Sequence, residues 1–348
     1  MTRSRALALL TLSLTLSMST WFSASAVIPQ LRDEWTLSTS AGAWLTIAVQ
    51  VGFVAGAVLS SALTLADVLP PHRVILLGSL GAAGSNALLL EAHGTASAIP
   101  LRLATGFFLA GVYPPAFKLM ATWFTRGRGT ALGLLAGAIA LGSALPHLVN
   151  ALGGVEWKLV IAVTSVLTVL GGLVAAVGVP EGPHPFPRAV FDPRQIALVR
   201  HNRGVRLASY GYFGHMWELF AMWTWFVAFA RDELVESRGG AALLTFAVVG
   251  AGAIGCVGGG LLGDRVGRPE TTAAAMALSG ACALTIGFVP RTVALGVAVV
   301  WGLTVIADSA QFSTMVTEHA DQAYVGTALA LQLAIGFALT VGTRSILP

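Results

Sequence analysis

The sequence predicts an all-α polytopic membrane protein with about eleven transmembrane helices. Its 348 residues are 55% hydrophobic and only 10% charged, whereas soluble domains carry roughly a quarter charged residues. Apolar runs recur along the whole chain, and each reaches the roughly 20 residues that a helix needs to cross a bilayer. The net charge of +4 therefore concerns membrane orientation, and we expect the lipid bilayer, not nucleic acid, as a partner.

Eleven apolar runs are the candidates for spanning helices. Gly and Pro are common in membrane helices, where small residues let helices approach closely, so the 40 glycines do not oppose this assignment. Arg3 and Arg5 before the first run, with Ala24-Ser25-Ala26 near its end, also fit a cleaved signal peptide. Ten further spans favour an uncleaved first helix. The runs are 6–28, 40–65, 74–92, 96–123, 130–152, 159–179, 205–230, 241–262, 271–289, 292–316 and 325–346.

The distribution of Lys and Arg between the runs predicts the orientation. Cytoplasmic loops carry an excess of these residues, and a cytoplasmic N-terminus places twelve of them inside and six outside, with Arg102 and Lys118 inside spans. We therefore expect a multi-pass protein of the plasma (inner) membrane with its N-terminus in the cytoplasm. The inner set is Arg3, Arg5, Arg73, Arg126, Arg128, Arg188, Arg194, Arg200, Arg203, Arg206, Arg265 and Arg268.

The longest connection, residues 180–204, is rich in proline and arginine and follows the sixth run. It reads as a cytoplasmic linker, so we predict a bundle of six helices over 1–180, a linker over 181–204 and a bundle of five over 205–348. Asp67 and Asp264, which follow the second and eighth runs, are 197 residues apart. That spacing matches the roughly 200 residues between the first and seventh runs and indicates two related halves.

The polar segment Gly260-Leu261-Leu262-Gly263-Asp264-Arg265-Val266-Gly267-Arg268 lies between two apolar runs. Gly267 permits a tight turn, Arg265 and Arg268 place charge at the headgroups, and Asp264 can bond a neighbouring helix end. The pattern resembles the loop signature of the major facilitator superfamily, Gly-x-x-x-Asp-Arg-x-Gly-Arg. The alternative is an ordinary basic loop. In the first half Asp67 precedes Val68-Leu69-Pro70-Pro71, without the following Arg and Gly, so its role as the gating latch of the family is open.

Other segments carry the same resemblance. Arg102-x3-Gly106 in the fourth run is similar to the family's motif there, Trp157-Lys158 opens the sixth run and Pro180-Glu181 closes it. The resemblance implies two six-helix bundles related by a pseudo-twofold axis, with Arg102 lining a central cavity. The fifth run has the glycine spacing of drug/proton exporters but lacks their Gly-Pro pair, which weakens that assignment.

The family has twelve spans and this sequence has eleven. With a cytoplasmic N-terminus, eleven spans put the C-terminus outside. We expect a truncated or frame-shifted chain that lacks the last transmembrane helix, rather than a natural eleven-helix carrier.

Ionisable residues at membrane depth are costly and usually mark pathways. They occur here in the fourth, seventh and tenth runs, three of the four that line the cavity in the superfamily: Arg102, then His215 with Glu218, then Asp308. His147 in the fifth run follows Pro146, and a role in the helix kink is the expectation for it. His215 and Glu218 are three residues apart, share a helix face and predict a proton site with Glu218 as acceptor; a structural pair is the alternative. Asp308 predicts a cation site or a partner for Arg102. We expect Arg102 either to contact an anion or to balance the charge of Asp308 or Glu218. We expect Trp217 to form part of a pocket wall.

These features predict a secondary active transporter that moves a small polar or anionic solute by alternating access, with protons as the coupling ion. We expect a monomer, not an enzyme, that needs neither a cofactor nor a metal; Cys256 and Cys282 lie in apolar runs and read as packing residues. One alternative is a proton-driven multidrug or metabolite exporter, which the aromatic seventh run favours. Another is a polytopic membrane enzyme, for which Asp232-Glu233 and Glu318-His319-x-Asp321 are sparse candidates. A sensor derived from a transporter is the third.

Overall fold

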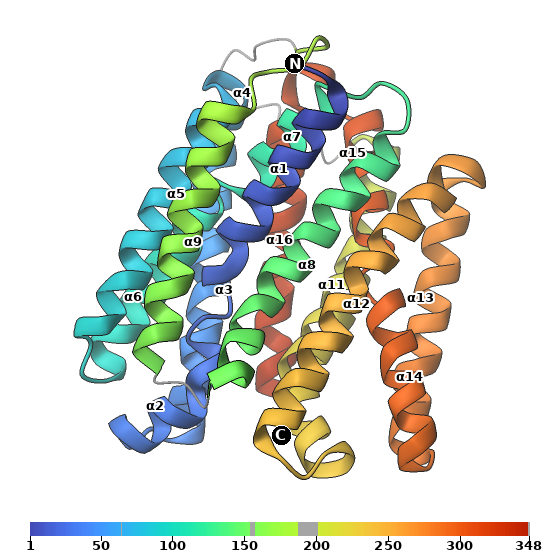
Figure 1. Cartoon of the computed structure of the whole chain (residues 1–348). Coiled ribbons are helices and arrows are strands. Elements are labelled where there is room, and N and C mark those ends of the chain that lie inside the picture. The colour runs from blue at the N-terminus through green and yellow to red at the C-terminus, as the bar shows by residue number, and fades with distance from the viewer. Residues whose placement is uncertain (64, 154–156, 187–200, 347–348) are drawn as a thin grey trace.

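The computed structural model describes residues 1–63, 65–153, 157–186 and 201–346, and every regular element in that part of the chain is a helix. Figure 1 shows the long helices running side by side between two ends of the molecule. The N-terminus lies at one end, here called the N face, and the C-terminus lies at the other, here called the opposite face. This is the all-α polytopic architecture that the composition predicts.

The first half of the chain contains the helices of the first six runs. Side chains cap some of their starts: Thr2 accepts a hydrogen bond from the backbone of Arg5, and Ser38 accepts one from Ala41, as expected of hydroxyl residues at helix N-caps. The elements are α1 (Arg3–Ser17), η1 (Met18–Thr20), η2 (Ser25–Val27), α2 (Ile28–Trp35), α3 (Thr39–Ala62), α4 (Leu65–Val68), α5 (Pro71–Ala87), η3 (Leu88–Glu91), α6 (Thr95–Leu109), α7 (Tyr113–Ala121), α8 (Arg128–Gly153) and α9 (Trp157–Gly178).

The second half contains the remaining five runs. Asn202 and Ser237 cap its first two long helices. The elements are α11 (Arg203–Phe229), η4 (Ala230–Leu234), α12 (Arg238–Arg265), α13 (Arg268–Thr285), η5 (Ile286–Phe288), α14 (Arg291–Thr304), α15 (Ser309–His319), η6 (Gln322–Tyr324) and α16 (Val325–Ile346). The predicted linker falls largely on residues 187–200, which lie outside the described residues, so the predicted boundaries of the two halves stay a prediction.

The number of spanning helices agrees with about eleven. Within the described residues, nine helical stretches are long and apolar enough to cross a membrane, and the α1–η1 and η2–α2 segments together add a tenth that is bent by 47°. The remaining helix, α11, has 27 residues but carries polar side chains such as His215 and Glu218. Its length suffices to cross a bilayer, and it packs among the other spans.

Three of the spans are broken near their middle. The first leaves regular α-helix after Ser17, the fourth breaks between α6 and α7, and the tenth breaks between α14 and α15. Pro114 and Pro115 stand at the start of α7, where their missing N–H groups cost nothing. Tyr113 and Ser309 begin α7 and α15, and they are 196 residues apart, so the two later breaks occupy equivalent places in the two halves.

Glycines allow the same close helix contact in each half. A Cβ at Gly52 of α3 would overlap the carbonyl oxygen of Leu103 on α6, and a Cβ at Gly255 of α12 would overlap that of Leu303 on α14. Small residues that bring helix backbones together in this way are typical of membrane proteins. The matched contacts support the expectation of two related halves.

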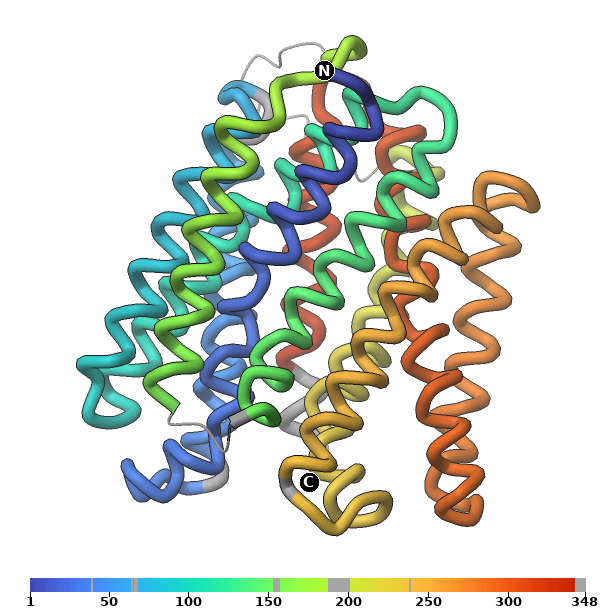
Figure 2. Tube along the Cα trace, in the orientation of Figure 1, coloured from blue at the N-terminus to red at the C-terminus, as the bar shows by residue number. Residues whose placement is uncertain are grey.

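The two halves meet along two helix pairs. α8 packs along α12, and α3 packs along α16; Figures 1 and 2 show α8 and α12 side by side over most of their length. Gly133 of α8 lies so close to α12 that its Cβ would overlap the carbonyl oxygen of Cys256. Cys256 and Cys282 are free and buried, as expected of packing residues.

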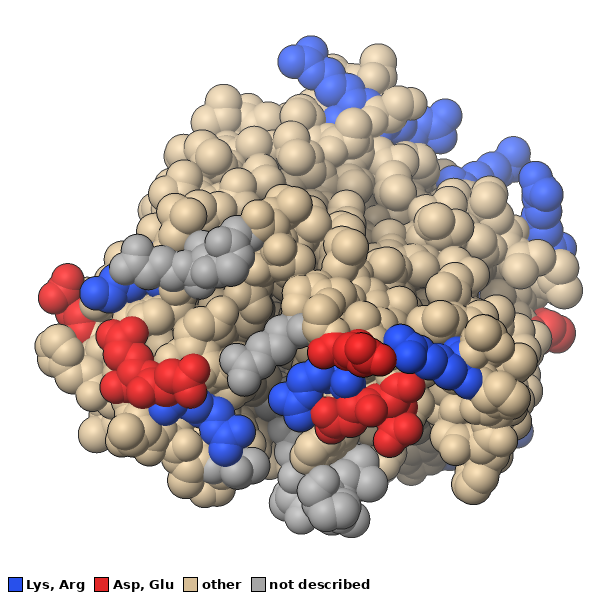
Figure 3. Space-filling model, turned by 60° about the horizontal axis from the view of Figure 1, so that its bottom comes forward, with Lys and Arg blue, Asp and Glu red and all other residues tan. Residues whose placement is uncertain are grey.

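Charged side chains gather at the ends of the molecule. Figure 3 shows them in separate groups on the opposite face, among uncharged residues. The acidic residues of the segments that turn there include Asp33, Glu34, Asp232 and Glu233. Large apolar side chains such as Leu77, Ile254 and Phe288 are exposed on the long helices and their ends, at 63, 72 and 90%. An apolar flank between charged ends is the surface that a bilayer requires.

Candidate functional site

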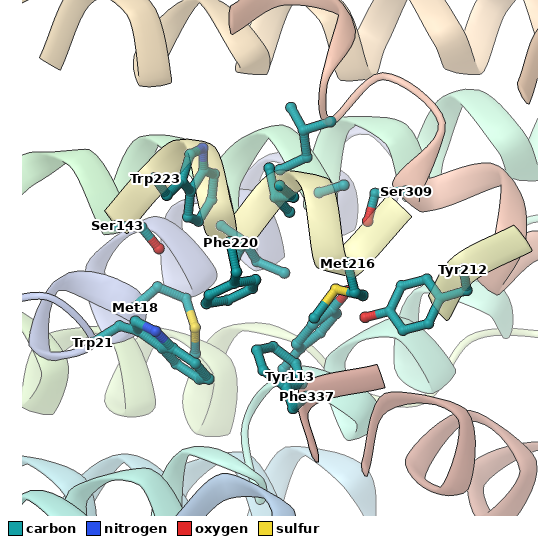
Figure 4. Close-up of a pocket in the computed structure, with 14 residues that line it drawn as sticks. Met18, Trp21, Tyr113, Ser143, Tyr212, Met216, Phe220, Trp223, Ser309 and Phe337 are labelled. Atoms are coloured by element: carbon teal, nitrogen blue, oxygen red, sulfur yellow. The ribbon is translucent and has the colours of Figure 1, made fainter. Parts of the chain in front are cut away.

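A small cavity lies in the centre of the molecule, where the two halves meet. It offers about 30 Å³ to the centres of water molecules, room for one or two waters, so this conformation is nearly closed around it. Figure 4 shows the lining side chains converging from both halves. Six of them are aromatic: Trp21, Tyr113, Tyr212, Phe220, Trp223 and Phe337.

The rest of the wall is formed by aliphatic side chains, thioethers and two hydroxyls. Met18 and Met216 contribute the thioethers, and Ser143 and Ser309 contribute the hydroxyls. No Lys, Arg, Asp or Glu belongs to the described lining. Trp21 is 4% exposed, and its indole Nε1 has no hydrogen-bond partner among the described residues, so the wall holds one buried donor that a ligand could satisfy.

The broken helices place several of these side chains. Trp21 follows η1, Tyr113 begins α7 and Ser309 begins α15, so the three breaks all meet the cavity. On the continuous helix α11, Tyr212, Met216 and Trp223 line it at spacings of four and seven residues, which lie on one face of an α-helix. Broken spans around a central site are a recurring feature of secondary transporters.

A buried histidine–aspartate pair lies just behind this wall. His215 Nδ1 is 2.8 Å from Asp308 Oδ1, and the two side chains are 1% and 2% exposed. The distance suits an ion pair once the imidazole is protonated. The two groups do not meet the geometry of a hydrogen bond, so Asp308 Oδ1 has no hydrogen-bond partner in the described structure. His215 Nε2 has none there either. Asp308 directly precedes Ser309 of the lining, so the pair adjoins the cavity.

Glu218 is on a different side of α11. Its Oε1 accepts hydrogen bonds from Ser279 Oγ at 2.5 Å and from Trp301 Nε1 at 3.1 Å. The structure thus pairs His215 with Asp308 rather than with Glu218. The predicted proton site at His215 and Glu218 remains untested as a function, but its two members have separate partners.

Arg102 is fully buried inside the first half. Its guanidinium donates to three backbone carbonyls, those of Thr20, Trp21 and Leu45, and to the side chains of Ser23 and Asn86. It makes no ion pair with Asp308 or Glu218 among the described residues, so the expected counter-charge role is wrong. Arg102 is also absent from the cavity lining, because the carbonyls freed by the break after α1 already engage its donors.

Two tryptophans of α11 differ in their relation to the cavity. Trp217 is 41% exposed and is not part of the cavity wall, whereas Trp223 is 9% exposed and lines it. The prediction that Trp217 walls a pocket is wrong for this cavity, because a helix turns about 100° per residue and Met216 already occupies the inward direction.

A polar clamp joins the halves at the N face. Asp264 accepts hydrogen bonds from the backbone N–H groups of Gly129 and Thr130, at 3.2 and 2.8 Å, and from the hydroxyl of Thr130 at 2.7 Å. These groups form the first turn of α8, where the helix dipole favours a carboxylate. Arg268 contacts Asp264 at 3.2 Å and bonds Glu318 on α15.

The remaining residues of the loop motif have distinct places. Gly267 adopts φ 128°, which an L side chain rarely tolerates, and Gly260 packs against the backbone of Gly129. Arg265 is exposed and takes no described part in the clamp. The side chain of Asp67, the first-half counterpart of Asp264, lies outside the described residues.

The fold and the cavity define a class: polytopic carriers in which two helical bundles enclose a central site. The family model of the Major Facilitator Superfamily matches residues 10–342. The chain belongs to the Major Facilitator Superfamily, as its loop motif predicts.

Curated relatives are distant. The chain is 29% identical over 178 residues to the putative uncharacterized transporter YgaY of Escherichia coli, across 50% of this chain and 44% of the relative. It is 23% identical over 261 residues to the probable sulfoacetate transporter SauU of Cupriavidus necator, across 70% of this chain and 60% of the relative. The matched part of the chain therefore spans about half the length of these relatives.

Solved structures share the fold at low identity. The human organic anion transporter MFSD10 (TETRAN) superposes with a TM-score of 0.79 at 15% identity, covering 98% of this chain and 92% of that one. A bacterial homologue of the human lysosomal transporter Spinster, in an inward-facing and unoccupied conformation, gives 0.65 at 16% identity over 98% and 80%.

Sequence reasoning did not single out the aromatic residues of the cavity. The signal was present: Tyr212, Met216 and Trp223 recur on one helix face of the seventh run. An aromatic stripe is ordinarily core, and only the junction of the two halves turns it into a cavity wall.

Proposed function

We propose that this chain is a proton-coupled secondary transporter whose central cavity takes up small aromatic or apolar solutes. The observation that carries this proposal is the wall of six aromatic rings and two thioethers, with no charged side chain in the described lining, next to the buried His215–Asp308 pair. Apolar pockets with a few placed polar groups bind apolar ligands and orient them. The free indole donor of Trp21 favours a solute with one hydrogen-bond acceptor.

An anionic solute has less support. A carboxylate or sulfonate needs a cation or several donors in a site that excludes water, and Arg102, the expected contact, donates to carbonyls and side chains of its own bundle. Organic anions remain the second candidate because two similar proteins are called a probable sulfoacetate transporter and an organic anion transporter. The sequence led us to expect a small polar solute. We propose an apolar one instead, because the cavity wall is mostly aromatic and apolar.

Proton coupling is assigned to His215 and Asp308. Protonated His215 balances the Asp308 carboxylate, and a second proton on Asp308 removes the charge attraction that ties α11 to the break before α15. That attraction is strong in a dry interior. Protonation at Asp308 would thus free the two helices that line one side of the cavity, which is the change a coupling site must make.

Alternating access follows from the clamp on the N face. The Lys and Arg distribution predicts that this face lies in the cytoplasm of a plasma-membrane protein, and with that orientation the clamp of Asp264 would hold the cytoplasmic side shut. Opening that side requires Asp264 to leave the start of α8, and the halves then rock about the cavity. We expect the monomer to suffice, since the cavity lies within one chain.

The membrane-enzyme alternative gains no support from its candidate residues. Asp232 pairs with its neighbour Arg231, and both are more than half exposed. Glu318 is held by Arg268 as part of the clamp. Neither group faces the cavity.

The test is transport in proteoliposomes with an imposed pH gradient. Neutral aromatic solutes and organic anions of matched size are compared for wild type, Asp308→Asn and Trp223→Ala, with Glu233→Gln on the opposite face as control. Gradient-driven flux of the aromatic solutes, lost in the first two variants and kept in the control, is expected. Flux of organic anions alone would refute the apolar assignment, and flux indifferent to pH in all variants would refute the coupling.

A further inference from the structure

The polar groups of the central cavity lie at its two ends. Figure 4 shows Trp21 and Ser143 toward one end, here called the indole end, and Tyr212 and Ser309 toward the other, here called the tyrosine end. The ring of Phe220 is 6.5 Å from that of Trp21 and lies eight residues after Tyr212 along α11. At about 1.5 Å per residue, the two ends are therefore about 12 Å apart.

The indole end offers donors to a hydrogen-bond acceptor. The indole Nε1 of Trp21 has no partner among the described residues. The Ser143 hydroxyl, on a side chain that is 3% exposed, makes no described hydrogen bond either. Gly142 packs against Met18, which brings the next residue of α8, Ser143, close to the segment that carries Trp21. Two donors at one place suit a carbonyl oxygen, because it has two lone pairs.

The tyrosine end offers hydroxyls from both halves. The Tyr113 hydroxyl of the first half lies close to the hydroxyls of Tyr212, Ser309 and Ser313 of the second half. A hydroxyl has one donor and two acceptor positions, so this cluster carries twice as many acceptor positions as donors. It therefore suits a solute hydroxyl, which donates to one of these oxygens and accepts a hydrogen bond from another.

Between the two ends the wall is apolar and aromatic. Met216, Phe220 and Phe337 line it, and the ring centroids of Phe220 and Phe337 are 5.2 Å apart. An aromatic solute packs well against such rings. A para-disubstituted benzene with a hydrogen bond at each end spans about 11 Å, close to the separation of the two ends. A meta substituent leaves the long axis of the ring and meets the apolar wall instead.

We propose that the cavity selects neutral phenols that carry a carbonyl group para to the hydroxyl. The carbonyl oxygen accepts hydrogen bonds from Trp21 and Ser143, and the phenol bonds Tyr212 and the hydroxyls beside it. Because Trp21 and Ser143 belong to the first half and Tyr212 to the second, such a solute bridges the halves. The choice of this cavity as a site for neutral aromatic solutes rests on the proposed function, whereas the length, the two polar ends and the orientation of the solute are new.

Binding is measured by calorimetry with the full chain in lipid nanodiscs, with empty nanodiscs as the blank, at about pH 6, where a phenol keeps its proton. The probe is 4-hydroxyacetophenone. Its meta isomer misplaces one polar group, acetophenone lacks the hydroxyl, and 4-ethylphenol lacks the carbonyl. We expect the probe to bind about two- to tenfold more tightly than each of these three, because each forgoes one neutral hydrogen bond.

Two variants assign the ends separately. Tyr212→Phe should weaken the binding of the probe and of 4-ethylphenol about two- to tenfold and leave acetophenone unchanged. Ser143→Ala should weaken the probe and acetophenone and leave 4-ethylphenol unchanged. Tyr210→Phe is the matched control, because Tyr210 is on the same helix outside the described lining, and it should bind all ligands like wild type.

The ligand series on the wild-type chain decides the case in which a variant does not fold. Equal binding of the probe, its meta isomer, acetophenone and 4-ethylphenol overturns the selection of para phenols and leaves the apolar site of the proposed function standing. The same loss for all ligands in Tyr212→Phe and Ser143→Ala overturns the assignment of the two ends. Binding of none of the four overturns this selection and the proposed apolar site together. The expected preference without gradient-driven flux supports the selection and overturns only the proposed coupling.

Discussion

Asp264, on the last turn of α12, caps the start of α8 in the other half. Its carboxylate accepts hydrogen bonds from the backbone N–H groups of Gly129 and Thr130 and from the hydroxyl of Thr130. A carboxylate at a helix N-terminus is stabilised by the orphan donors and by the dipole together. Because α8 and α12 come from different halves, this cap joins the halves on the N face. Any conformation that opens that face must give up these bonds.

Replacing Asp264 by Asn should shift the protein toward conformations that are open on the N face. The amide keeps one acceptor but loses the charge, which is worth about 1 kcal/mol at a helix start, so the closed fraction should fall severalfold. Spin labels at Arg126→Cys and Ala273→Cys, with Cys256 and Cys282 replaced by Ala, report the distance across this face. Arg265→Gln is the matched control, since Arg265 is exposed beside Asp264 and has no described bond. If both variants give the same distance distribution as the parent, the clamp does not hold the halves.

Gly255→Ala should destabilise the second half, whereas Gly250→Ala on the same helix should not. A Cβ at Gly255 overlaps the Leu303 carbonyl, while a Cβ at Gly250 meets nothing within 4 Å. Overpacking costs about 1–3 kcal/mol, and alanine at the open position gains up to about 1 kcal/mol of helix propensity. Heating with a thiol-reactive dye, which reports on the buried Cys256 and Cys282, should show a lower midpoint for Gly255→Ala only. A lower midpoint for both variants would mean that glycine itself, and not the close approach, matters.

The fold was predictable because the bilayer imposes it. A chain with 10% charged residues and regular apolar runs has few alternatives to a helical bundle, and the spacing of Asp67 and Asp264 predicted two related halves. The sequence contains a further repeat, Gly129-Thr130-Ala131-Leu132 and Gly326-Thr327-Ala328-Leu329, again 197 residues apart. The loop motif also predicted that Asp264 can bond a helix end, but not which helix.

The site was less predictable, because pairing depends on the rotation of each helix. The spacing of His215 and Glu218 allows a shared face, but a difference of three residues leaves them about 60° apart, enough for His215 to meet Asp308 and for Glu218 to meet Ser279. Arg102 reads as a pathway residue from its depth alone. Its true surroundings depend on a helix break that frees carbonyls, and no pattern in the first run announces that break.

Trp21→Phe should weaken the binding of solutes that carry a hydrogen-bond acceptor and leave purely apolar solutes unchanged. The ring is retained, but the indole donor, which has no partner in the described structure, is removed. One neutral hydrogen bond contributes about 0.5–1.5 kcal/mol, so the half-saturating concentration should rise roughly two- to tenfold. Trp217→Phe, on the exposed side of α11, is the control and should change neither class. An equal effect on both classes of solute would mean that Trp21 contributes through the shape of its ring and not through its hydrogen-bond donor.

Arg102→Lys should cost stability first and transport only as a consequence. Lysine has three donors on a flexible stem and cannot reproduce the planar fork of arginine, so the Trp21 carbonyl loses its described donor and the carbonyls of Thr20 and Leu45 each lose one of theirs. Each buried acceptor left unpaired costs about 1–3 kcal/mol. We therefore expect a clear fall in the unfolding midpoint, read with the same dye, and a loss of flux in proportion to the loss of folded protein. A substrate contact predicts the reverse: an Arg102→Lys protein as stable as wild type, with a raised half-saturating concentration for anions. Measuring both quantities on one preparation therefore decides between a bundle-stabilising arginine and a substrate-binding one.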